Sequence, residues 1–427
     1  MDLGALSTRQ SPPLGVPLRF FLTAPLFVAA GGLVLLSHPE ALTDRWSAPM
    51  LAVTHAWVLG FMLMIMLGAL QQVIPVLIGV PLPAPERVSR HGHLLLTAGT
   101  ALLIFAFLGD AAGVFSVAAA LLAAGVIVVA WPAFGAVIRS PSAHATARGV
   151  GSALAALVVT LAFGVWLALG QGGLVPLARQ WTDVHLTWGL VGWTVLLVSA
   201  VAWQVVPMFQ ITPRYPRRFM HGFAPALGLA LLLWSIGKAA DWTPLRLVGA
   251  GLLSLVLSAF AAVTLYLQSK RRRRVPDATL DFWRLAMAAL VGAVSTWWLG
   301  RWMPQIPQVV PVILLAVGFA GSAILGMLYK IVPFLVWLHL TLFAQARGVA
   351  PRGIPNMKQV IPSERPRWLF RLHLAWLAIL LSAPYRPEWT GRAAGLLALA
   401  LAGLLFWHLL GAVRLHRERR LALEKSA

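Results

Sequence analysis

The sequence predicts an all-α integral membrane protein, and three observations lead to that prediction. Of the 427 residues, 59% are hydrophobic and only 11% are charged, whereas about 25% of the residues of a soluble domain are charged. The apolar residues form twelve long runs, and the loops between the runs are alternately rich and poor in Lys and Arg. The lipid bilayer is therefore the first partner that we expect for this chain.

The twelve apolar runs reach or approach the roughly 20 residues that a helix needs to cross a bilayer. Because backbone polar groups must be satisfied within lipid, we expect helices rather than barrel strands. The runs make one polytopic domain over residues 1–427, and we expect no cleavable signal peptide before the first run. They lie at residues 18–37, 50–80, 92–109, 111–138, 147–169, 182–212, 220–238, 243–267, 280–300, 308–341, 368–383 and 390–413.

Loop charge predicts the orientation of the chain. Six basic segments, among them "SKRRRRVPD" at 269–277 and the long loop 343–367, alternate with six segments that are poor in Lys and Arg. Since Lys and Arg collect in cytoplasmic loops, we expect both termini in the cytoplasm and the protein in a bacterial inner membrane. The same rule explains the formal charge of +21, so no nucleic-acid partner is expected. We expect the loop 343–367 to be a cytoplasmic connector without a fold of its own.

Three short segments of the sequence resemble one another. They are "LGALQQVIPVLIG" at 67–79, "SAVAWQVVPMFQI" at 199–211 and "LGMLYKIVPFLVW" at 325–337. Their prolines follow at steps of 132 residues (75 to 207) and 126 residues (207 to 333). The segments fall in the second, sixth and tenth runs, which predicts three repeats of four helices around a pseudo-threefold axis. The repeats would cover approximately 18–138, 147–267 and 280–413.

Each of these segments carries a polar residue three positions before its proline, namely Gln72, Gln204 or Lys330. Proline removes a backbone hydrogen bond and kinks the helix, so the polar side chain is expected to satisfy the freed carbonyl or a neighbouring helix. The alternative is a proton or ion route, because polar and charged residues within a membrane are often functional.

Two histidines are the candidate cofactor ligands. His55 lies 20 residues before Pro75 and His185 lies 22 residues before Pro207, each near the outer end of a run that carries the motif. Around a pseudo-threefold axis both rings can point into a shared interior, where a neutral imidazole can ligate haem or copper. The alternative for each is a hydrogen-bonded core histidine.

A second metal site is conceivable on the same side of the membrane. There His38 lies close in sequence to Glu40 and Asp44, and Asp183 is expected at the same membrane face. The alternative is an ordinary polar loop.

Sulfur ligands are not expected. The chain has no cysteine, which excludes thiolate ligands and iron–sulfur clusters. Met62, Met64 and Met66 alternate along the sequence, so they cannot share one helix face, and we expect them to pack in the core rather than to bind copper.

The arrangement resembles a known superfamily. Twelve runs with both ends inside, three four-helix arcs and His near the outer ends of the second and sixth runs resemble subunit I of the haem-copper oxidases. That superfamily includes nitric oxide reductases and NnrS-type proteins of the nitrosative-stress response. The stretch "THAWVLGFMLMIMLGALQQVIPVL" at 54–77 is similar to the second helix of these proteins. The resemblance implies that His55 ligates haem b and that His185 ligates copper.

The chain also departs from the family's pattern. The family's tenth helix supplies two haem-ligating His, but "QVVPVILLAVGFAGSA" at 308–323 contains none. The family's seventh helix carries a His pair for copper, but here it has only His221, and no Tyr follows His185 as in the family. An oxygen- or nitric-oxide-reducing binuclear centre is therefore not expected, and no catalytic residue is assigned. We expect at most one haem or one metal ion, bound by both His55 and His185.

Three hypotheses for the function remain open. The first is a haem- or metal-binding accessory protein or sensor in respiratory or nitric-oxide metabolism, with other membrane proteins of that metabolism as partners. The second is a transporter of small molecules or ions, whose cavity Lys330, Gln72 and Gln204 would line. The third is a cofactor-free scaffold or assembly subunit of a respiratory complex.

Overall fold

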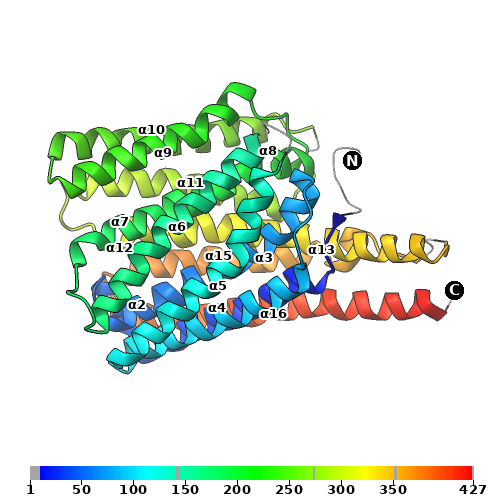
Figure 1. The fold of residues 1–427 in the computed structure, drawn as a ribbon, viewed down its shortest axis with the longest axis horizontal. Helices are drawn as coiled ribbons and strands as arrows, with labels where there is room; N and C mark the ends of the chain where they lie inside the picture. The colour runs from blue at the N-terminus through cyan, green and yellow to red at the C-terminus, as the bar shows by residue number, and fades with distance from the viewer. Residues whose placement is uncertain (1–9, 141–144, 273–274, 351–352, 426–427) are drawn as a thin grey trace.

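The chain folds into a bundle of long helices that lie side by side (Figure 1). The computed structural model describes residues 10–140, 145–272, 275–350 and 353–425. In these ranges every element is a helix, and eleven helices are long and apolar enough to cross a membrane. The prediction of an all-α membrane protein is confirmed. Residues 273–274 of the basic run and 351–352 of the predicted connector lie outside the described residues.

The helices follow one another as three groups. The first group is α1 (Gly15–Ser37), η3 (Pro39–Thr43), α2 (Ala48–His55), η4 (Ala56–Leu63), α3 (Met64–Val73), η5 (Ile74–Ile78), α4 (Pro85–Leu108) and α5 (Ala112–Ile138). The second is α6 (Ala145–Gln171), η6 (Arg179–Trp181), α7 (Thr182–Thr187), η7 (Trp188–Val195), α8 (Leu196–Gln210), α9 (Arg217–Ala239) and α10 (Thr243–Ser269). The third is α11 (Ala278–Leu299), α12 (Val309–Ile313), η8 (Leu314–Gly321), α13 (Ser322–Ala346), α14 (Met357–Val360), α15 (Glu364–Ser382) and α16 (Pro387–Lys425).

The connector predicted at 343–367 is shorter than expected and partly folded. Helix α13 continues to Ala346, and α15 already begins at Glu364. Between them, α14 is a single turn of helix that is capped by Asn356, whose side chain accepts hydrogen bonds from the backbone N–H groups of Lys358 and Gln359. The cap satisfies the first N–H groups of the turn, which explains why so short a helix forms here.

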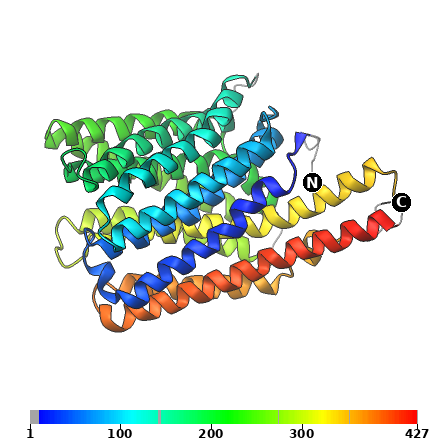
Figure 2. The ribbon, with the colours of Figure 1, turned by 60° about the horizontal axis from the view of Figure 1, so that its bottom comes forward.

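Three spans form the interior of the bundle, and they are the ones that carry the repeated motif. In Ala48–Ile78, Arg179–Gln210 and Val309–Ala346, 89%, 78% and 83% of the most apolar window is buried, against 22–56% in the other eight spans. The remaining helices surround these three, and α12 to α13 runs through the middle of the bundle in Figure 2.

Each interior span contains an eight-residue π-helical segment, which is wider than an α-helix. The segments η4, η7 and η8 begin at residues 56, 188 and 314, at steps of 132 and 126 residues. These are the steps that separate the three prolines. These segments were not expected from the sequence, because a dense apolar run carries no signal that distinguishes i→i+5 from i→i+4 hydrogen bonds.

A glycine lies in each π-helical segment at the same position, namely Gly60, Gly192 and Gly318. Each lies against the long helix that precedes its span, where little room is left for a side chain. A Cβ there would meet Phe27 Cγ at 2.2 Å, Ala156 Cβ at 3.0 Å and Ala289 Cβ at 2.6 Å, respectively. Small residues of this kind let helix backbones approach closely within lipid.

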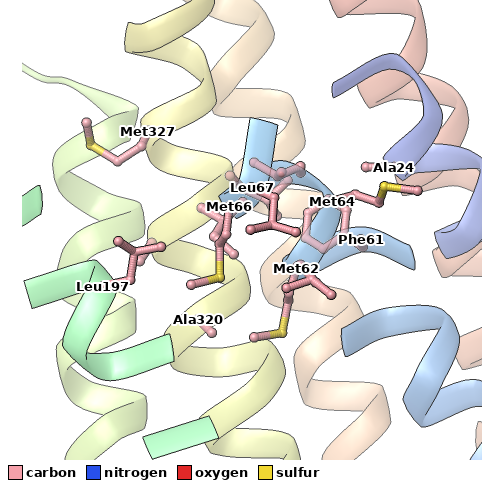
Figure 3. Close-up of a cluster of buried hydrophobic side chains, with 14 of the residues drawn as sticks. Ala24, Phe61, Met62, Met64, Met66, Leu67, Leu197, Ala320 and Met327 are labelled. Atoms are coloured by element: carbon pink, nitrogen blue, oxygen red, sulfur yellow. The ribbon is translucent and has the colours of Figure 1, made fainter. Parts of the chain in front are cut away.

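The methionines of the first interior span are buried in the core, as predicted. Met62, Met64 and Met66 are each at most 5% exposed. Figure 3 shows Met64 directed towards Ala24 and Met66 directed away from it, so their sulfur atoms do not converge.

Substitution of Gly60 by Ala tests the close approach of the first interior span to α1. The new methyl group would overlap the Phe27 side chain, and overpacking of this kind typically costs about 1–3 kcal/mol of stability. Gly251, in α10, is the matched control because no atom lies within 4 Å of its virtual Cβ. We expect Gly60→Ala to lower the thermal unfolding temperature in detergent, followed by tryptophan fluorescence, and Gly251→Ala to leave it unchanged or slightly raised. Equal effects of the two variants would contradict this packing.

Candidate functional site

His55 and His185 come together in the interior of the bundle. His55 is the last residue of α2, directly before η4, and His185 lies in α7, directly before η7. Their ring centroids are 6.5 Å apart, and the ring planes differ by 21°. Two residues that are 130 positions apart in the sequence (55 to 185) therefore face each other across one space.

Both rings are oriented by a backbone carbonyl. Nδ1 of His55 lies 2.7 Å from the carbonyl oxygen of Leu51, and Nδ1 of His185 lies 3.0 Å from that of Thr160. Because a carbonyl oxygen only accepts, each Nδ1 carries the proton and donates it, which leaves the lone pair on Nε2. An Nδ1–H that is bound to a backbone carbonyl is the usual arrangement of a metal-ligating histidine.

The space beside His185 depends on a glycine of α6. A Cβ at Gly164 would lie 2.9 Å from Cε1 of His185, so a larger residue would displace the ring. His55 is stacked on Phe107 of α4 at a centroid distance of 5.3 Å. The positions of both imidazoles are thus fixed by neighbours on other helices.

The two histidines line a cavity of about 310 Å³. Its wall is mostly aliphatic and aromatic, with Trp57, Phe107 and Trp193 among the larger side chains. Arg45 and Arg179 are the charged residues of the wall, and both lie in the sequence shortly before a histidine-bearing helix. An apolar cavity with a few polar groups is typical of sites that bind small molecules and cofactors.

Asp183 organises the charges beside this cavity. Its carboxylate pairs with Nη2 of Arg45 at 2.6 Å and with Nζ of Lys238 at 3.1 Å. Arg45 also donates through Nη1 to Oε1 of Gln308 at 3.2 Å. These bonds join the segment before α2 to α7, α9 and the start of α12. Asp183 was expected near His38 instead. The sequence signal for its actual partners was that Arg45 and Lys238 belong to the same predicted membrane face.

His38 is not part of this cavity. Its Nδ1 lies 3.5 Å from Oε1 of Glu40, and both side chains are exposed. Asp183 pairs with Arg45 and Lys238 instead and is not part of the His38–Glu40 pair. Across the described ranges, no group of three or more His, Cys, Asp or Glu is placed to hold a metal ion. The second metal site considered at His38 therefore has no third ligand among them.

The polar residues of the repeated motif bind side chains near the start of the first helix in their own group. Nε2 of Gln72 donates to Ser11 Oγ at 2.6 Å, Nε2 of Gln204 donates to Thr146 Oγ1 at 3.3 Å, and Nζ of Lys330 donates to Asp277 Oδ2 at 2.7 Å. None of these three residues lines the cavity of the two histidines. These bonds connect neighbouring helices, which was one of the two expectations for the polar residues.

The comparisons with known proteins add no assignment: no family model and no curated protein matches the chain.

Replacement of Asp183 by Asn tests the charge cluster. The variant leaves Arg45 and Lys238 without their shared carboxylate, so we expect the free energy of unfolding to fall. The expected loss is only about 1–2 kcal/mol, because water screens the charges of these partly exposed side chains. Glu424→Gln is the control: it removes a pair with Arg420 on the exposed end of α16 and should change stability by less than about 0.5 kcal/mol. Unfolding titrations in mixed micelles measure both. A loss for Asp183→Asn no larger than the control's would show that the cluster does not hold the helices together.

Proposed function

We propose that the protein binds one haem b between His55 and His185 and acts as a haem-containing accessory protein or sensor in respiratory or nitric-oxide metabolism. The observation that carries the proposal is the pair of imidazoles, each bonded through Nδ1 to a carbonyl, with ring centroids 6.5 Å apart. The metabolic assignment comes from the resemblance to the haem-copper oxidase superfamily.

The separation of the rings agrees with a shared metal. Because a metal–imidazole bond is about 2.0–2.1 Å long, two imidazoles that share one metal ion can have ring centroids up to about 6.5 Å apart. The observed 6.5 Å lies at the upper end of that range. Phe107 and Gly164 hold the two rings at this separation.

The size of the ligand set favours haem over a bare ion. A protein usually supplies three or four side chains to copper or zinc, and only two are present here in the described part of the chain. The porphyrin supplies the other four ligands of a haem iron, so two histidines suffice. The apolar wall suits the macrocycle, and Arg45 and Arg179 are candidates to pair with the propionates.

Haem with two histidine ligands supplies one-electron transfer. The chain's own residues would hold the group and set its properties. The carbonyls of Leu51 and Thr160 keep both Nδ1 atoms protonated and make the imidazoles stronger donors. The apolar wall excludes water, and the cationic mouth favours anionic propionates.

Three features support a fold of three four-helix repeats around a pseudo-threefold axis, as in that superfamily. The π-helical segments, their glycines and the prolines recur at the same steps of 132 and 126 residues. The polar residues Gln72, Gln204 and Lys330 recur with them and bind equivalent regions. The groups also follow one another in a ring, because α5 packs on α6, α10 packs on α11, and α16 packs on α1 (Figure 2).

We also infer that the chain crosses the membrane twelve times, with both termini in the cytoplasm of a bacterial cell. The two ends of the described chain lie towards the same end of the bundle (Figure 1), which supports an even number of crossings. α15 would be the twelfth; its first turns carry Glu364, Arg365 and Arg367, which distinguishes it from the eleven more apolar spans. The basic tail of α16 lies at the end that we assign to the cytoplasm.

Absorption spectroscopy of the purified protein tests the proposal. We expect a Soret band and one haem b per chain in the pyridine haemochrome assay, and loss of both in His55→Ala and in His185→Ala. His38→Ala and His221→Ala are matched controls that should keep the band, because neither residue lines the cavity.

Metal analysis of the same samples separates the alternatives. Stoichiometric copper without a Soret band, lost in both cavity variants, would replace haem by copper at the same pair. Folded protein with neither haem nor copper, or a Soret band that persists in both variants, would refute the proposal.

A further inference from the structure

A second and larger cavity lies beside the first and takes no part in the proposed haem site. It measures about 480 Å³ and is enclosed by α7, η7, α9, α10, α11, α12 and η8. Arg45, Leu186, Gln308 and Val312 line both cavities and form the partition between them.

The lining of this cavity changes from charged to apolar along three of the spans that form it. On α10 the lining residues run from Arg246 to Leu257, eleven residues or about 16 Å along the helix axis. On α11 and the turn that follows it they run in the same way, from Arg301 in the turn to Leu290 in the helix. On α7 and η7 they run from Asp183 to Val191. The charged groups therefore share one end of the cavity and aliphatic side chains fill the other.

The charged end is strongly positive. Its cations are Arg45, Lys238, Arg246 and Arg301, and its one carboxylate is Asp183. Asp183 is fully engaged by Arg45 and Lys238. Over the described residues, neither Arg246 nor Arg301 forms an ion pair, so two guanidinium groups at the mouth have no anionic partner.

Both guanidinium groups are held near the mouth by neighbouring side chains. Arg301 lies over the ring of Trp297 at 5.6 Å and also over that of Trp298. Nη2 of Arg246 lies 3.4 Å from the hydroxyl oxygen of Thr243. A planar guanidinium held in this way is well suited to a bidentate contact with phosphate or carboxylate.

We propose that this cavity binds an anionic amphiphile, whose phosphate or carboxylate group lies between Arg246 and Arg301 and whose apolar body fills the space between α10 and α11. The charge gradient along the cavity matches a molecule of that kind and fits neither a purely polar anion nor a neutral hydrocarbon. The inference does not depend on the haem proposal, because it uses different residues.

The amphiphile has two possible sources, the bilayer and the aqueous phase. The outer face of α10 is apolar and exposed at Trp242, Val248 and Leu255, so lipid can reach the helix that lines the cavity. An anionic phospholipid supplies both a phosphate and acyl chains. A water-soluble organic phosphate or carboxylate would enter past the arginines.

Native mass spectrometry of the full chain in detergent tests the proposal, with dioleoylphosphatidylglycerol, dioleoylphosphatidylcholine and phenyl phosphate as probes. We expect the anionic lipid to bind at least about tenfold more tightly than the zwitterionic one. The double variant Arg246→Gln/Arg301→Gln should weaken that binding about ten- to a hundredfold, because it removes two charge-assisted contacts.

The double variant Arg386→Gln/Arg392→Gln is the matched control. It removes the same charge from exposed arginines that line neither cavity, and it should leave binding unchanged. Binding of phenyl phosphate but not of lipid, lost only in the cavity variant, would support the proposal with a soluble source. The proposal is overturned when neither anion binds the wild-type protein, or when the two double variants, both monodisperse and helical, bind equally.

Discussion

The structure depends on the close approach of three interior helices to the helices that precede them. Within lipid, no hydrophobic driving force holds helices together, so van der Waals contact must do so. Gly60, Gly192 and Gly318 provide that contact, and each lies in a π-helical segment. In the first two spans this segment directly follows the short helix that carries His55 or His185. A wider helical turn shifts the register of the helix beyond it. The glycine contacts and the π-helical segments therefore determine together where His55 and His185 point.

The apolar runs and the loop charges were sufficient to predict the class of the fold, because a bilayer imposes length and composition directly on the sequence. The pairing of His55 with His185 was also expected, since the repeated Gln/Lys and Pro motif placed both at one level. The Asp183 cluster was not expected. Arg45 and Asp183 are 138 residues apart, and a short motif carries no information about contacts across such a distance. The second cavity was missed for the same reason, because seven separate helical elements supply its lining.

The two cavities are physically coupled through their shared wall. Arg45 donates to Asp183 on one side and to Gln308 on the other, and all three belong to different helical groups. A ligand that draws Arg45 towards the larger cavity would change the field at the smaller one, because an arginine charge acts over several ångströms in an apolar interior. Arg45 thus physically connects the wall of the larger cavity with the cavity of the two histidines.

The contact between α1 and α16 has a consequence for synthesis of the chain. Gly32 and Gly395 lie against each other so closely that a Cβ on either would approach the other's carbonyl oxygen within 2.9 Å. Helix α1 therefore obtains this neighbour only after α16 has been synthesised and inserted. Until then its glycine face is covered by lipid or by an insertase, and premature termination leaves that face open. This contact consequently forms late in assembly, and nascent chains that still lack α16 are vulnerable to degradation.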